Sequence, residues 1–160
     1  MSEVDLYRLF KTPHVISVIL LGSGFVIEAI CGILAARAQT VQEVRVFARL
    51  MAFSENALSP VAALAIAVFG YLTASRLHLS LDVTWVLLGQ ILFYGIAILA
   101  IAILRPAANE LLRLSEAAPD GPVTSDLQAR LKKSLPAIVG PVTSLMFISI
   151  VYLMVSKPSW

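Results

Sequence analysis

Apolar residues are concentrated in four long runs, and polar stretches separate these runs. The runs cover residues 15–36, 57–74, 83–104 and 137–155, so each is about 18–22 residues long. A helix of that length rises ~1.5 Å per residue and crosses a hydrocarbon core about 30 Å thick. None of the runs has the polar face of a helix that covers a soluble domain. The pattern therefore predicts four transmembrane helices.

The polar connections predict further helical segments outside these spans. Residues 37–56 keep apolar positions three and four apart, which indicates a helical extension near the membrane surface. Residues 107–116 and 124–134 predict two short helices, divided by a Pro-Asp-Gly-Pro turn at residues 119–122. The predicted fold class is all-α, a polytopic membrane protein whose single domain, residues 1–160, is a four-helix transmembrane bundle.

Composition agrees with a membrane protein and argues against several functions. Of the 160 residues 59% are hydrophobic and 14% are charged, whereas soluble domains carry about 45–50% apolar and about 25% charged residues. The net charge of +2 is too small to indicate a nucleic-acid partner. The sequence has no Gly-rich phosphate loop, no G-x-S-x-G motif and no C-x-x-C motif. We therefore assign no catalytic residue and do not expect an enzyme.

The basic residues predict how the chain is oriented. Four Lys and Arg residues lie in the N-terminal tail, the second connection and the C-terminal tail, whereas eight lie in the first and third connections. Connections rich in Lys and Arg stay in the cytoplasm. Both termini are therefore predicted to lie outside the cytoplasm.

Glu28 is a carboxylate within the first apolar run. Such a group costs about 2.5–3.5 kcal/mol at the centre of a membrane helix and usually faces the bundle interior. Estimates of depth along the spans place it beside Gln90, Tyr94 and Ser144, which predicts an intramembrane polar cluster. Two interpretations stay open: a site for a proton or ligand, or a protonated carboxyl that holds helices together by hydrogen bonds.

His14 and His78 are the only histidines, and both are expected near the outer membrane surface. Two histidines can ligate haem or copper, so the pair is a candidate metal site. The spacing of the two residues matches no metal-binding motif, and a histidine at the membrane surface needs no partner. An interfacial role without a metal is the alternative.

Several short motifs resemble a known family. Residues 6–15, with the sequence LYRLFKTPHV, are followed by Gly22-Ser23-Gly24, and Arg-Pro and Lys-Pro pairs at residues 105–106 and 157–158 follow the third and fourth spans. This pattern resembles a bacterial family of predicted four-span integral membrane proteins of unknown function. That family is distantly similar to the membrane domains of CopD-type copper-resistance proteins and HemJ-type protoporphyrinogen oxidases. The resemblance implies a bacterial inner-membrane location, and it implies haem or copper chemistry at His14, with Lys11 nearby.

Three functional hypotheses follow for this multi-pass protein of the lipid bilayer. The first is an accessory or structural subunit without catalytic activity, as a homo-oligomer or within a larger membrane complex. The second is a protein that handles haem or copper through His14. The third is a small proton-coupled transporter or channel that uses Glu28.

Overall fold

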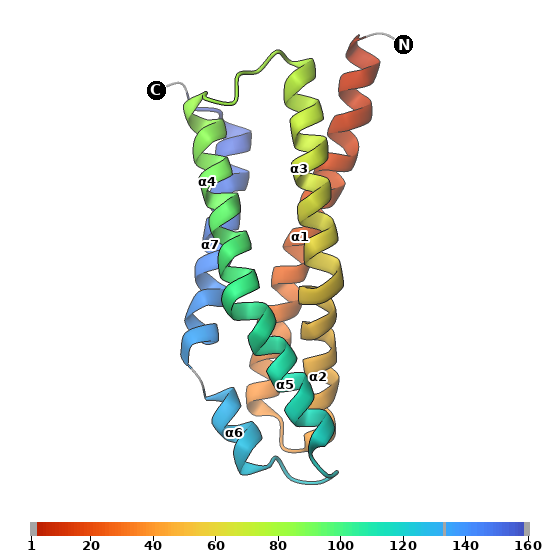
Figure 1. Cartoon of the computed structure of the whole chain (residues 1–160), viewed down its shortest axis with the longest axis vertical. Coiled ribbons are helices and arrows are strands. Elements are labelled where there is room, and N and C mark those ends of the chain that lie inside the picture. The colour runs from red at the N-terminus through yellow and green to blue at the C-terminus, as the bar shows by residue number, and fades with distance from the viewer. Residues whose placement is uncertain (1–2, 133, 159–160) are drawn as a thin grey trace.

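The computed structural model describes residues 3–132 and 134–158, and it confirms an all-α bundle with four long apolar helices. These helices run side by side along one axis (Figure 1). The elements are, in chain order, α1 (Glu3–Arg37), α2 (Val41–Phe53), η1 (Ser54–Leu58), α3 (Ser59–Arg76), α4 (Thr84–Leu99), η2 (Ala100–Leu104), α5 (Arg105–Ala117), α6 (Ser125–Leu131) and α7 (Ser134–Ser156).

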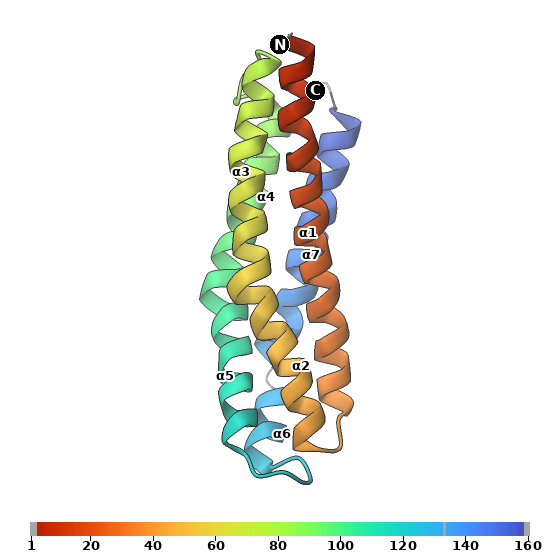
Figure 2. The same cartoon turned by 90° about the vertical axis from the view of Figure 1, so that its right-hand side faces the viewer.

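Two of the long helices extend well beyond the predicted spans. Elements α2, η1 and α3 form one continuous helix over Val41–Arg76, and α4, η2 and α5 form another over Thr84–Ala117. Figure 2 shows α2 and α3 as a single, slightly bent ribbon beside α1. The helical extension expected over residues 37–56 is therefore present from Val41 onward, and it is continuous with the second long helix.

Prolines explain why each of these helices contains a π-helical turn. Pro60 and Pro106 have no N–H group, and in a regular α-helix each ring would clash with the carbonyl four residues earlier. In η1 the Ser59 N–H donates to the Ser54 carbonyl, and in η2 the Arg105 N–H donates to the Ala100 carbonyl. These bonds span five residues, so the wider turn accommodates the proline and the helix continues.

The four long helices pack mainly as two pairs, α1 with α3 and α4 with α7 (Figure 1). Glycines allow close approach within each pair. A Cβ atom at Gly70 would lie 2.9 Å from the His14 ring, and one at Gly95 would lie 2.7 Å from the Met146 methyl group. The pairs meet where the Phe25 ring of α1 lies 5.3 Å from the Phe147 ring of α7.

The end of the bundle opposite the chain termini carries a cap, which we define as α2, α5 and α6 (Figure 1). Its buried core consists of Val41, Val44, Ala48, Leu111 and Leu127. The loops at this end are joined by backbone hydrogen bonds, because the Val41 N–H donates to the Gly121 carbonyl at 2.9 Å. Gly121 has a φ of 140°, which side-chain-bearing residues rarely adopt, so this turn requires glycine.

Helix length explains why a cap is present. The four candidate spans contain 32–36 residues each, whereas about 20 residues are enough to cross the hydrocarbon core. The surplus length of the second and third long helices projects beyond the bilayer and forms α2 and α5. We call α1, α3, α4 and α7 the membrane part.

Candidate functional site

A pair of carboxyl groups lies where the membrane part meets the cap. Glu28 comes from α1, and Glu55 comes from the π-helical turn η1. The two carboxyl groups lie close enough to interact directly with each other. Glu55 is only 5% exposed, and the Ser54 hydroxyl donates to Glu28 Oε1 at 2.8 Å. The sequence thus places two acidic side chains in one buried site.

Small residues on α1 make room for this site. A Cβ atom at Gly24 would lie 2.9 Å from the Ser59 hydroxyl oxygen and 3.1 Å from that of Ser54. Gly24 precedes Glu28 by one helical turn, so the glycine brings η1 close to the face that carries the carboxyl group. The wider turn of η1 directs both Ser54 and Glu55 inward, since both are buried.

Polar side chains beside Glu55 connect η1 with α5. Asn56, next to Glu55, donates from Nδ2 to Asn109 Oδ1 at 2.7 Å and accepts at Oδ1 from Arg105 Nε at 2.8 Å. The Arg105 guanidinium is also close enough to Glu55 to attract its carboxylate. Arg105 is exposed, so its charge acts on Glu55 from the surface of the molecule, whereas no hydrogen bond among the described residues joins Asn56 to either carboxyl group.

The contact between Glu28 and Glu55 has a chemical consequence. An ionised carboxylate only accepts hydrogen bonds, whereas a protonated carboxyl group also donates one. A hydrogen bond between two carboxyl groups therefore requires a proton on one of them. Two adjacent carboxylates also repel each other when both are ionised. The pair therefore favours a state in which at least one of the two carboxyl groups is protonated.

The polar cluster predicted around Glu28 is not assembled as expected. Gln90 donates to the Leu81 carbonyl at 3.3 Å, and the Ser144 hydroxyl donates to the Gly140 carbonyl at 3.0 Å. Tyr94 is 60% exposed. The depth estimate assumed that the second helix begins at residue 57, but it begins at Val41, so Glu28 lies at the level of Ser54. That level is more than one helical turn nearer the cap than predicted.

His14 has a defined place between α1 and α3. Its Nδ1 lies 3.1 Å from the Ile66 carbonyl oxygen, and the ring fills the space left by Gly70. A carbonyl only accepts hydrogen bonds, so Nδ1 carries the proton and Nε2 is the nitrogen left for another partner. Histidine ligands of metals commonly have this arrangement.

His78 does not complete a two-histidine metal site with His14. The helix from Gly70 to its end at Arg76 already spans about 9 Å, and His78 lies beyond that end. His78 adopts a φ of 49° and ends the helix, with the Leu79 N–H donating to the Ala74 carbonyl. Over residues 3–132 and 134–158, no three His, Cys, Asp or Glu side chains are grouped to hold a metal ion. The described residues thus show no cluster of metal ligands at His14 or His78.

Glu55 and Ser54 were not recognised from the sequence, although a signal for Glu55 was present. Ala48, Ala52 and Glu55 are spaced by four and three residues, so they share one helix face. Ala48 and Ala52 are both buried, and Glu55 is buried with them. Because residues 37–56 were interpreted as an extension near the membrane surface, Glu55 was not considered as a partner of Glu28.

The fold, with its four long apolar helices, defines a polytopic helical membrane protein. A family described as a predicted integral membrane protein, DUF2269, matches residues 8–158, and the chain belongs to this family. Comparison with the curated proteins and with the solved structures finds no match. The family description agrees with the resemblance seen in the sequence, and it assigns no activity.

Proposed function

We propose that this integral membrane protein moves protons, with Glu28 and Glu55 as its proton-binding site. The observation that supports the proposal is the close contact between the carboxyl groups of Glu55, which is buried, and Glu28, which is half-buried. Ionisable side chains inside a membrane helix are costly, and they commonly mark proton relays. The exposed Arg105 guanidinium lies near Glu55, which supports access to this site from the cap side.

Proton flux into liposomes tests the proposal. The purified chain is reconstituted with a trapped pH-sensitive dye, and a potassium diffusion potential drives proton entry. We expect flux above that of empty liposomes, and we expect Glu28→Gln and Glu55→Gln to abolish it. Glu116→Gln is the matched control, because Glu116 is an exposed carboxylate paired with Arg49 on the cap surface. Wild-type flux equal to that of empty liposomes contradicts the proposal.

We further propose that the cap lies in the cytoplasm of a bacterial cell and that both termini lie on the other side of the inner membrane. The loops and helices of the cap end carry most of the Lys and Arg residues, and such segments are retained in the cytoplasm. Alkaline phosphatase fused after Trp160 should be active, and a fusion at Asp120 should be inactive. The opposite pattern would reverse the orientation.

A further inference from the structure

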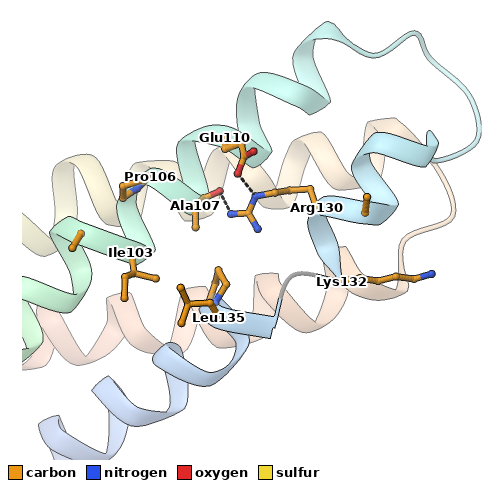
Figure 3. A pocket seen from close by; sticks show the side chains of 10 residues that line it. Ile103, Pro106, Ala107, Glu110, Arg130, Lys132 and Leu135 are labelled. Carbon is orange, nitrogen blue, oxygen red and sulfur yellow. Dashed lines mark hydrogen bonds and ion pairs between the residues drawn. The ribbon is translucent and has the colours of Figure 1, made fainter.

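A groove at the border between the membrane part and the cap is separate from the carboxyl pair. It has a volume of about 550 Å³ and lies between α5, α6 and the start of α7 (Figure 3). Its apolar walls come from Ala102, Ile103, Leu135 and Pro136, and its charged lining consists of Glu110, Arg130 and Lys132. The groove therefore combines an apolar surface with two basic groups and one carboxylate.

The depth of the groove coincides with the membrane surface. Ala102 and Ile103 are near the end of the third apolar run, and Leu135 and Pro136 directly precede the fourth. Both runs thus meet the polar cap at one level, where lipid headgroups lie. A molecule in the groove contacts hydrocarbon-depth side chains at one end and Arg130 at the other.

Contacts with α5 hold the Arg130 guanidinium in place, and it keeps an N–H donor that makes no hydrogen bond within the described residues. The residue is 7% exposed, and its Nη2 donates to the Ala107 carbonyl at 2.6 Å. Its Nε lies 2.7 Å from Glu110 Oε2, and the two charged groups form an ion pair. The N–H at this Nε makes no hydrogen bond with any of the described residues, because no acceptor is aligned with it. The third guanidinium nitrogen takes part in neither dashed contact in Figure 3 and points toward Leu135.

We propose that this groove binds an anionic phospholipid of the surrounding bilayer. The phosphate accepts hydrogen bonds from the Arg130 guanidinium, and an acyl chain lies against Ile103 and Leu135. Arg guanidinium groups bind phosphate through their planar array of donors, and basic pockets between membrane helices bind anionic headgroups. Lys132 at the outer edge points away from Arg130 in Figure 3, so it adds attraction over a longer distance.

Native mass spectrometry of the full chain in mild detergent tests this proposal. Dioleoylphosphatidylglycerol is the anionic probe and dioleoylphosphatidylcholine is the zwitterionic reference, each titrated against wild-type protein and variants. We expect the anionic lipid to bind about fivefold more tightly, and we expect Arg130→Gln to remove that preference. Arg113→Gln is the matched control, because it deletes the same charge from an exposed site on α5 outside the groove.

Two further variants keep the test decisive if Arg130→Gln does not fold. The double variant Glu110→Gln with Arg130→Gln removes both partners of the buried ion pair and should also lose the preference. Leu135→Trp fills the groove without changing charge and should weaken binding of both lipids, whereas Leu145→Trp, at an exposed site on the same helix, should not. Equal binding of the two lipids by wild type, or equal loss in Arg130→Gln and Arg113→Gln, overturns the proposal.

Discussion

The cap and the membrane part are built from the same long helices but are stabilised in different ways. The cap buries a compact apolar core and joins its helices through Arg side chains, such as Arg45, which binds Asp120 and the carbonyls of Ser115 and Ala118. In the membrane part large apolar side chains such as Ile98 point outward, and Thr73 donates to a carbonyl of its own helix. Water drives burial in the cap, whereas lipid accepts exposed apolar side chains.

Several unusual features lie at the border between the cap and the membrane part. Both π-helical turns, the carboxyl pair and the lipid groove lie there. A buried carboxyl pair needs enough protein around it to exclude lipid, and a proton pathway needs access to water. At the border η1 is packed against α1, and the exposed Arg105 lies close to Glu55.

The largest expected difference in the free energy of unfolding is between the loss of an apolar side chain in the cap and the loss of one in the membrane part. Leu127 in the cap is fully buried, so Leu127→Ala should lower the free energy of unfolding by about 2–5 kcal/mol. Ile98 in the membrane part is 66% exposed, so Ile98→Ala should cost less than about 1 kcal/mol. Chemical unfolding in detergent micelles measures both, and similar losses would remove the distinction between the regions.

A second contrast concerns two arginines one helical turn apart on α2. Arg45→Gln leaves the carbonyls of Ser115 and Ala118 without this donor, so the free energy of unfolding should fall by about 1–3 kcal/mol. Arg49→Gln breaks only an exposed ion pair with Glu116, which is worth at most about 1 kcal/mol. The same unfolding measurement ranks the two variants, and a larger loss in Arg49→Gln would contradict the assigned contacts.

A third contrast concerns two glycines of the membrane part, and its expected effect on the free energy of unfolding is similar to or smaller than that of the two arginines. Gly70→Ala forces the new Cβ against the His14 ring, which should cost about 1–3 kcal/mol. Gly32→Ala, with open space at its Cβ, should be neutral or stabilise its helix by up to about 1 kcal/mol. Melting temperatures in one detergent compare them, and a stabilised Gly70→Ala would show that α1 and α3 are not closely packed there.

The sequence predicted the spans better than it predicted the site. Apolar runs identify membrane helices because the bilayer sets their length. The Pro-Asp-Gly-Pro turn correctly separated α5 from α6, although α5 is the end of the third long helix and not a separate short helix. The second apolar run was misleading, because it begins at residue 57 whereas the helix begins at Val41 and continues through η1. That error shifted every depth estimate along the second helix, so Glu55 was not recognised as a neighbour of Glu28.

Partners of Glu28 could not be derived from periodicity alone. Periodicity gives the face of a helix on which a residue lies, but the relative height of two helices depends on where each begins. Gly24 and Ser54 set that height for α1 and η1, and their contact is between residues thirty positions apart. Only the packed structure shows that a serine hydroxyl and a second carboxyl group lie at the level of Glu28.

Infrared spectroscopy of the protein in lipid tests the central claim, a proton held between Glu28 and Glu55, most directly. At neutral pH the wild-type protein should give the carbonyl stretch of a protonated carboxyl group, shifted by exchange into heavy water. The double variant Glu28→Gln with Glu55→Gln should lose this band, and Glu116→Gln should keep it. A wild-type spectrum without the band, or a band that survives in the double variant, would contradict the proposed site.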